Sequence, residues 1–471
     1  MPIEFSNQLT ARTTPIPGVV LFDLPVHGDN RGWFKENWQR EKMLALGLPD
    51  FGPVQNNISF NAKTGTTRGI HAEPWDKFVS VAAGRIFGAW VDLREGPSFG
   101  AVFTAELDPG RAIFIPRGVG NAFQTLEDNT VYTYLVNDHW SADAQHRYTF
   151  LNLADETAAI AWPVPLERAE LSEQDKAHPR LADVAPMPPK KTLVLGADGQ
   201  LGKALRALYD GDPSVEFAGR ADFDLADEAS FASRNWRDYR AIINAAAYTA
   251  VDDAETPGGR TAAWGINVTA VTRLARAAVE HGLTLVQVSS DYVFDGSRQV
   301  HGEDEPPSPL GVYGQTKAAA DAVVGVVPRH YIVRTSWVVG EGNNFVRTMA
   351  GLAARGIKPA VVNDQTGRLS FAADIAAGIR HLLDTAAPYG TYNLSNDGEP
   401  RSWADIAGEV YELSGRPGAD VQGVSTAEYF AGRKAAPRPA NSTLDLGKLA
   451  ERGFHPPAAG ARLREFLDGP G

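Results

Sequence analysis

The chain has 471 residues, of which 43% are hydrophobic and 22% charged, and it contains no cysteine. This composition is typical of a soluble globular protein with two or three domains, and the missing cysteines exclude disulfides, thiolate metal sites and cysteine nucleophiles. Acidic residues exceed basic residues by 57 to 45, and the net charge of −12 disfavours nucleic acids and anionic membranes as partners. The first residues do not read as a secretory signal, and no apolar run is long enough to span a membrane, so we expect a cytoplasmic protein.

Residues 17–162 have the pattern of a β-rich domain. Short apolar segments are separated by turn residues, and this spacing predicts an antiparallel sandwich or barrel. The expected strands are Gly18–Leu24, Phe78–Val81, Ile86–Leu93, Val102–Leu107, Ala112–Ile115 and Thr130–Val136, with one helix at Arg40–Leu46.

The pattern changes after a proline-rich segment, Val184–Lys191, which we interpret as an exposed, semi-rigid linker. Strands then alternate with helices, which predicts a parallel, doubly wound α/β sheet of the Rossmann type. The expected elements are strands Thr192–Leu195, Ala241–Asn244 and Leu285–Val288 and a helix at Val268–His281. We therefore divide the chain into a β domain (1–183), a linker (184–191) and an α/β domain (192–471).

A glycine-rich turn opens the α/β domain. Gly196, Gly199 and Gly202 follow the first strand and precede a helix, so the backbone can approach a pyrophosphate that the helix N-terminus then binds. The alternative is a tight turn with no ligand. Arg220 stands where the second strand should end, and it is either a ligand for the 2′-phosphate of NADP or a surface arginine. The residues expected to contact NADPH or NADH are Gly196, Asp198, Gly199, Gln200, Leu201, Gly202, Arg220, Asp224, Ala245, Ala246, Ala247, Tyr313 and Lys317.

A second motif in this domain points to reduction of a ketone. Tyr313 and Lys317 are four residues apart and share one face of a helix. The lysine charge should lower the pKa of the phenol and favour proton donation to a carbonyl oxygen, with the Ser290 hydroxyl as a third group. The alternative is a surface pair, but the order of nucleotide motif, serine and YxxxK is that of short-chain dehydrogenases/reductases.

Five further segments make the similarity more specific. The stretches Ile243–Glu255, Ser289–Gly296, Arg334–Trp337, Val362–Gln365 and Arg438–Ser442 resemble dTDP-4-dehydrorhamnose reductase. The resemblance implies reduction of a 4-keto sugar nucleotide by NADPH or NADH, a small substrate-binding subdomain, catalytic roles for the serine, tyrosine and lysine, and substrate contacts by Trp337 and Arg438. Lys203-Ala204 replaces a pair that often ends in glutamate in this family, so we expect no magnesium.

The β domain holds a different set of polar residues. His71 is the single histidine in its segment, whereas a cupin-type metal site needs several, so no metal is expected. A neutral histidine held by an aspartate can remove a proton beside a ketone, a tyrosine can return it from the opposite face, and cationic side chains can stabilise the enolate and bind a diphosphate. The alternative is a histidine with a purely structural role.

The segments Asp29–Glu36, Gln55–Ser59, Arg68–His71, Ile115–Gly118 and Tyr132–Tyr134 resemble dTDP-4-dehydrorhamnose 3,5-epimerase. The resemblance implies a cupin-like jelly roll, or double-stranded β-helix, that forms a homodimer. It also implies a catalytic set and a substrate-binding set. The catalytic set is His71 as base, Asp155 as its partner, Tyr134 as proton donor and Lys77 at the enolate, and the substrate-binding set is Arg31, Glu36, Gln55, Arg68 and Asn121.

The two resemblances fit one reaction sequence, because the product of the first activity is the substrate of the second. We interpret the chain as a bifunctional enzyme that binds a dTDP-linked 4-keto-6-deoxy sugar and makes dTDP-L-rhamnose. Two alternatives remain open: epimerisation at C3 alone, or a β domain that binds a sugar nucleotide without catalysis.

Overall fold

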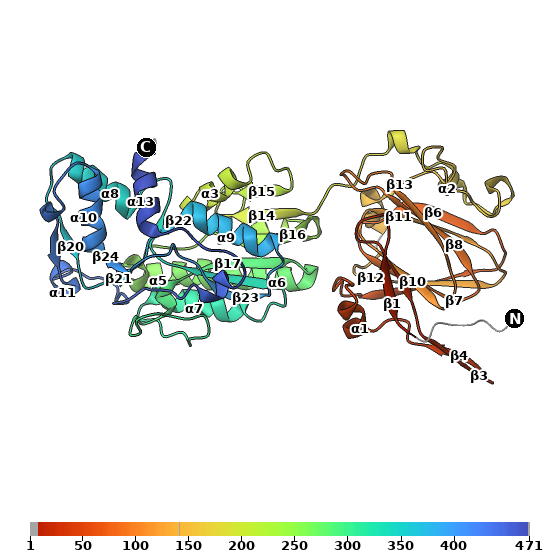
Figure 1. Ribbon diagram of the computed structural model, residues 1–471, viewed down its shortest axis with the longest axis horizontal. Coiled ribbons are helices and arrows are strands. Elements are labelled where there is room, and N and C mark those ends of the chain that lie inside the picture. Colours follow the sequence, from red (N-terminus) through yellow and green to blue (C-terminus); the bar gives the residue numbers. More distant parts are fainter. Residues whose placement is uncertain (1–7, 141, 470–471) are drawn as a thin grey trace. The chain divides into compact units, whose positions relative to one another are not determined.

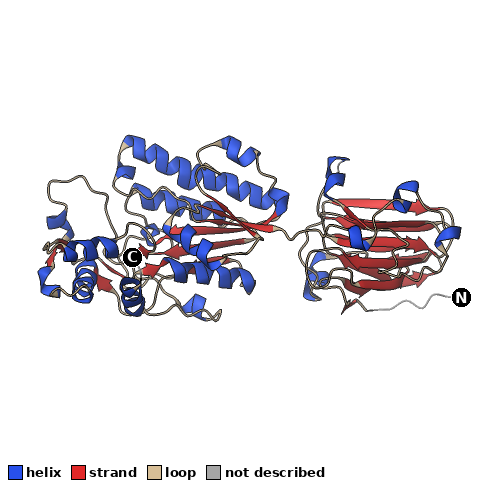
Figure 2. Ribbon diagram, turned by 90° about the horizontal axis from the view of Figure 1, so that it is seen from above, coloured by secondary structure: helices blue, strands red, loops and turns tan. Residues whose placement is uncertain are grey.

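The computed structural model describes residues 8–140 and 142–469, and the chain divides into two compact units between Pro189 and Lys190. Figures 1 and 2 show a unit made mainly of strands and a unit in which helices cover both faces of a sheet. Each unit is described by itself.

The first unit contains two antiparallel sheets, as the sequence predicts. One has the order β1-β2-β10-β7-β12-β5 and the other β13-β6-β11-β8-β9. The inward faces of both sheets contribute to a shared core that includes Val79, Ile113, Trp90 and Phe123. The strands are β1 (Thr10–Thr13), β2 (Val20–Asp23), β5 (Gln55–Asn61), β6 (Thr67–Ala72), β7 (Lys77–Ala83), β8 (Ile86–Asp92), β9 (Val102–Leu107), β10 (Arg111–Ile115), β11 (Val119–Thr125), β12 (Thr130–Val136) and β13 (Thr149–Phe150).

A separate hairpin, formed by β3 (Val26–Asp29) and β4 (Gly32–Lys35), projects from the first unit (Figure 1). Its side chains are largely exposed, among them Trp33 and Phe34. The helix α1 (Arg40–Ala45) follows within one residue of the predicted bounds. It packs Met43 against a small core beneath the six-stranded sheet.

The expected linker is shorter than the sequence suggests. Val184 and Met187 are buried in the first unit. The Met187 amide donates to Leu93, and the Met187 carbonyl accepts from Glu95, so this segment is tied to the end of β8. The prediction of an exposed linker over 184–191 is therefore wrong for its first part, because two apolar side chains among the prolines find a core to fill.

The second unit is built on a parallel sheet with the order β15-β14-β16-β17-β18-β23, which confirms the α/β prediction. One core cluster lies between the sheet and α6 and α7, and another between the sheet and α3 and α9. The elements are β14 (Lys191–Leu195), β15 (Val215–Ala218), β16 (Tyr239–Asn244), β17 (Thr284–Ser290), β18 (His330–Thr335), β23 (Gly390–Asn393), α3 (Gln200–Leu208), α4 (Glu228–Ala232), α5 (Pro257–Trp264), α6 (Val271–His281), α7 (Val312–Val324) and α9 (Ala372–Asp384).

A smaller group of elements packs around its own core, which includes Val346, Val361, Ile406 and Tyr411. It contains α8 (Phe345–Ala354), β20 (Ala360–Val362), α10 (Trp403–Leu413), β25 (Gln422–Val424), α11 (Thr426–Tyr429) and α13 (Ala459–Asp468). Two-residue strands and α12 (Gly447–Ala450) join this group to the sheet: β19 (Val338–Val339), β21 (Thr366–Gly367), β22 (Ser370–Phe371) and β24 (Arg401–Ser402). Among the described residues of both units, no helix combines the length and the apolar character that crossing a membrane requires.

Candidate active sites

A cleft of about 1370 Å³ lies in the second unit at the carboxyl ends of β14, β16 and β17. Ligands bind at this edge of open α/β sheets because the connecting loops diverge there. The predicted residues that line the cleft are Gly196, Asp198, Gly199, Gln200, Leu201, Arg220, Asp224, Ala245, Ala246, Ala247, Ser290, Tyr313, Lys317 and Trp337.

The glycine turn is shaped for close approach of the backbone. Gly196 has a φ of +78°, and a Cβ on it would lie 2.7 Å from the amide nitrogen of Ala246. A Cβ on Gly202, which does not line the cleft, would overlap the carbonyl oxygen of Gly196. Both positions therefore require glycine, and α3 begins at Gln200 with its free N–H groups at the turn.

Arg220 and Asp224 lie together on the wall of this cleft. The guanidinium Nε is 3.5 Å from a carboxylate oxygen of Asp224, and the Arg220 side chain is 84% exposed. An exposed ion pair of this kind is weak. The arginine is therefore available to an anion in the cleft.

Ser290, Tyr313 and Lys317 meet on the cleft wall between β17 and α7. Lys317 Nζ donates a hydrogen bond of 2.6 Å to the carbonyl of Val288. Burial raises the pKa of Tyr313 to about 12, and a hydrogen bond with Ser290 opposes that shift. Burial also lowers the pKa of Lys317 to about 8. The expectation of a lowered phenol pKa is thus wrong, because burial raises this pKa and the charges of Asp291 and Asp321 add to the shift. The phenol keeps its proton at neutral pH.

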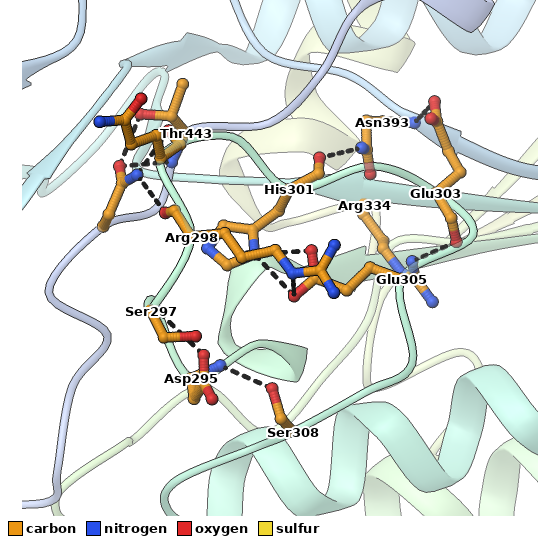
Figure 3. Close-up of polar contacts among 12 residues, drawn as sticks. Asp295, Ser297, Arg298, His301, Glu303, Glu305, Ser308, Arg334, Asn393 and Thr443 are labelled. Carbon is orange, nitrogen blue, oxygen red and sulfur yellow. Dashed lines mark hydrogen bonds and ion pairs between the residues drawn. The ribbon is translucent and has the colours of Figure 1, made fainter.

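Asp321 and Arg334 form a buried ion pair near Lys317 that the sequence did not predict. Asp321 lies one helical turn after Lys317, and its carboxylate accepts a hydrogen bond of 3.0 Å from Arg334 Nε. Figure 3 shows how Arg334 is fixed in turn: its Nη1 donates to the carbonyl of Glu303, whose carboxylate accepts from the backbone of Asn393. Asp321 could have been recognised from its spacing, because a residue four positions after Lys317 lies on the same face of a helix.

The two predicted substrate residues of this unit lie in different settings. Trp337 lines the cleft and stacks on Trp403, with ring centroids 3.7 Å apart. Arg438 makes two hydrogen bonds of 2.9 Å to the carboxylate of Asp252. Its charge also acts on Tyr292, a residue of the cleft wall. Trp337 is therefore open to a ligand, whereas the Arg438 guanidinium is held by the Asp252 carboxylate.

In the first unit, His71 on β6 has a different partner from the one expected. Its Nε2 lies 2.9 Å from Oδ1 of Asp175, which belongs to the short helix α2 (Glu173–Lys176). Asp155 instead accepts hydrogen bonds from the backbone amides of Thr157, Ala158 and Leu181. The assignment of Asp155 as dyad partner is therefore wrong, because its carboxylate is used to close a turn.

Lys77 and Tyr134 lie together on neighbouring strands of the other sheet. Lys77 Nζ is 5.2 Å from the centroid of the Tyr134 ring and forms an ion pair with Glu73. Burial lowers the pKa of Lys77 to about 7. Burial also raises the pKa of Tyr134, against the nearby charge of Arg68. The Lys77 amine, a protonated phenol and the Arg68 guanidinium thus share one region.

A chain of aromatic rings connects this region with His71. Tyr134 packs with Trp75 and Tyr148, and the Tyr148 ring lies 5.8 Å from that of Phe150. The Phe150 ring is 5.6 Å from the imidazole of His71. The His71 imidazole and the Tyr134 ring are therefore connected by a continuous row of aromatic side chains.

The predicted substrate residues of the first unit are scattered. Arg68 donates to Asn61, Gln55 donates to Asn57, and the Asn121 amide is tied to Trp90 and Tyr132 in the core. Arg31 pairs with Asp29 on the exposed hairpin, and Glu36 pairs with Lys42. Within residues 8–140 and 142–469, none of the recorded contacts of Arg31 or Glu36 is with His71, Lys77 or Tyr134.

Two family models match the chain in separate regions. The model described as "RmlD substrate binding domain" covers residues 190–469, and the model described as "dTDP-4-dehydrorhamnose 3,5-epimerase" covers residues 13–183. The two matches follow the division between the structural units.

Individual relatives agree with this division. A "Protein RmlC homolog" of Streptococcus pyogenes is 53% identical over 180 residues, which are 37% of this chain and 90% of that protein. A "dTDP-4-dehydrorhamnose reductase" of Sinorhizobium fredii is 39% identical over 276 residues, which are 55% of this chain and 90% of that protein. A crystal structure of such a reductase from Bacillus anthracis in complex with NADP is 32% identical with a TM-score of 0.54, and the match covers 59% of this chain and 98% of that chain.

Proposed function

We propose that this chain, which belongs to the RmlD substrate binding domain family over residues 190–469 and to the dTDP-4-dehydrorhamnose 3,5-epimerase family over residues 13–183, is a bifunctional enzyme of dTDP-L-rhamnose synthesis. It epimerises dTDP-4-dehydro-6-deoxy-D-glucose at C3 and C5 and then reduces the C4 ketone with NADPH in the cytoplasm. The observation that carries the proposal is that one chain holds both a His71–Asp175 pair and a cleft lined by Ser290, Tyr313 and Lys317.

In the first reaction, we assign His71 as the base. Asp175 takes up Nε2, which leaves Nδ1 to accept a proton from the carbon next to the ketone. The aspartate also stabilises the imidazolium that forms. Lys77 stabilises the enolate oxygen, and Tyr134, whose phenol stays protonated because burial raises its pKa, returns a proton.

In the second reaction, the residues of the cleft fit a nicotinamide dinucleotide. Gly196 and Gly202 in the glycine turn have no room for a side chain, which suits close approach of a pyrophosphate to the backbone, and Arg220 is placed to meet a 2′-phosphate. NADPH supplies the hydride. Tyr313 donates its proton to the C4 oxygen, Ser290 orients that oxygen, and the charge of Lys317 stabilises the phenolate left behind.

The order of strands supports a jelly roll for the first unit. From β5 to β8, and again from β10 to β13, successive strands alternate between the two sheets, with β9 beside β8. A jelly roll shows this alternation because its paired strands wind together around the barrel, so that consecutive strands fall in opposite sheets.

We also propose that the first unit forms a homodimer through the β5 edge and the β3–β4 hairpin. Ile58 and Phe60 on β5 are 69% and 60% exposed, and Phe34 on the hairpin is 70% exposed. Apolar side chains on a sheet edge favour pairing with a second copy. Arg31 and Glu36 lie on or beside this hairpin, so we assign them to substrate bound by the partner. The measurement is the molar mass in solution, which should halve in an Ile58→Lys/Phe60→Lys variant.

The overall proposal is tested by giving the purified chain dTDP-4-dehydro-6-deoxyglucose and NADPH. We expect NADPH consumption and a product with the L-rhamnose configuration by NMR. A product inverted at C3 alone would favour the 3-epimerase alternative. NADPH consumption only after addition of another epimerase would show that the first unit is not catalytic.

A further inference from the structure

Three side chains that can bind a metal meet at one end of the first unit. The ligand atoms of His71, Asp175 and His178 all lie within 4.8 Å of one another. His71 comes from β6, and Asp175 and His178 lie on and just after α2, which packs beside that strand (Figure 1). The sequence did not suggest this cluster, because His178 is 107 positions from His71 and outside any motif.

His178 is held in place by packing rather than by hydrogen bonds. Its ring stacks on Phe150 at 4.6 Å and lies edge-on to His71 at 5.4 Å. Both ring nitrogens are buried, and neither makes a hydrogen bond of acceptable geometry. A ring nitrogen without a hydrogen-bond partner can bind a metal as the neutral imidazole.

We propose that His71, Asp175 and His178 form a binding site for a divalent transition-metal ion such as Zn²⁺. The ion takes the place of the proton that His71 and Asp175 share. Their nitrogen and oxygen are 2.9 Å apart, and ligand bonds of about 2.0–2.2 Å can span that gap from a common centre. Two imidazoles and one carboxylate leave further positions for water, and imidazole suits Zn²⁺, Ni²⁺ and Cu²⁺ better than Mg²⁺ or Ca²⁺.

The surroundings of Asp175 suit a metal ligand. Its backbone amide is bound by the Ser172 hydroxyl, and its side chain is 8% exposed. Fixed outer contacts of this kind orient a ligand before the metal arrives. His71 is about one-third exposed, which leaves the ion a path from solvent.

Metal binding does not depend on the proposed function, whereas the effect of the metal on catalysis rests on that function. An ion on Nε2 of His71 keeps the remaining ring proton on Nδ1, so Nδ1 cannot accept a proton from the substrate and the epimerase reaction should stop while the metal is bound. The reductase site shares no residue with this cluster. The ion should therefore separate the two activities of one chain and act as a reversible inhibitor of the first.

Binding is measured first, on the full chain without nucleotide, by calorimetric titration with Zn²⁺ and by the visible absorption of bound Co²⁺. We expect one site per chain, weakened at least tenfold in His178→Phe, a change that keeps the ring stacked on Phe150 and removes both nitrogens. His178→Gln serves as a second variant. His27→Phe, at an exposed histidine of β3, is the matched control and should bind as the wild type does. Equal affinity in the two His178 variants and the wild type, or no binding by the wild type, would overturn the proposal.

The second arm follows exchange of the C3 and C5 hydrogens with deuterated water. One equivalent of Zn²⁺ should reduce the exchange rate at least tenfold, and a chelator should restore it. Oxidation of dTDP-L-rhamnose with NADP⁺, which needs only the second unit, should be unchanged. Full exchange with Zn²⁺ bound would place the ion away from His71 and overturn the proposal. A chain that shows no exchange even without metal would contradict the function proposed for His71, while the titration would still decide the metal site.

Discussion

His71 and Asp175 are 104 positions apart in the chain, yet Nε2 of the histidine lies 2.9 Å from Oδ1 of the aspartate. A strand of the five-stranded sheet carries one residue, and a four-residue helix capped by Ser172 carries the other. The pair therefore depends on how the segment after the last strand folds back over the sheet.

Asp175→Asn should lower the rate of deuterium exchange by a factor on the order of 10² or more, because the imidazole loses the group that orients it and stabilises its charge. Asp155→Asn is the matched control. It weakens hydrogen bonds to three backbone amides, so it should lower the free energy of unfolding by about 1–3 kcal/mol and leave the exchange rate of the folded protein nearly unchanged. If Asp155→Asn lowered the exchange rate and Asp175→Asn did not, Asp155 would be the partner of His71.

His71→Ala should abolish exchange and stop NADPH consumption from the D-configured 4-keto sugar, because the second unit receives no substrate. Adding a separate active 3,5-epimerase should restore consumption, since Ser290, Tyr313 and Lys317 belong to another unit. Exchange at the wild-type rate would require a different base.

Tyr313→Phe should reduce reductase turnover by a factor on the order of 10² or more, because the proton donor is removed. NADPH binding, measured by fluorescence titration, should change little, since the pyrophosphate is assigned to the turn at Gly196–Gly202. Turnover close to that of the wild type would contradict the role given to Tyr313.

Arg220→Ala tests the choice of cofactor. If the guanidinium meets the 2′-phosphate, the wild type should bind NADPH more tightly than NADH, and the variant should bind both alike. The preference should also weaken with added salt, because Arg220 is exposed and its interaction is screened. Equal binding of both cofactors by the wild type would identify Arg220 as a surface residue.

Asp321→Asn should shift the pH profile of the reductase. Burial lowers the pKa of Lys317 to about 8, and the Asp321 charge raises it. The charged lysine is therefore lost as pH rises through about 8, and without the aspartate it should be lost at a lower pH. Asp321→Glu should restore the wild-type profile. The Asp321→Asn change also removes the ion-pair partner of Arg334 and lowers stability. The quantity to compare is therefore the pH at which activity falls, not the maximal activity. If that pH is unchanged, Asp321 acts only as a structural ion pair.

Secondary-structure elements that depend on local sequence patterns could be predicted from the sequence. Short apolar segments between turn residues predicted several strands of the first unit, and the change to strand–helix alternation at Thr192 predicted the parallel sheet. The nucleotide turn was predictable because its glycines are required by the backbone itself, as Gly196 illustrates. The pKa of Tyr313 was not, since it depends on how much water the folded cleft removes.

The partner of His71 was also beyond sequence reasoning. Asp155 and Asp175 are both aspartates near turns, and nothing local distinguishes one that closes a turn from one that faces a histidine. The tertiary fold decides which backbone amides each carboxylate meets, and only that assignment leaves Asp175 for His71.

The attachment of Met187 to the end of β8 affects how the gene could be cut to obtain the two halves separately. A fragment that stops at residue 183, where the epimerase family match ends, would lack Val184 and Met187 and would expose the surface of Leu93 and Leu181 that they cover. Each lost side chain removes about 1.5–3 kcal/mol of burial, enough to make an excised domain aggregate on expression. A fragment that continues to Pro189 keeps both anchors, and it should yield a far more tractable protein than one cut six codons earlier.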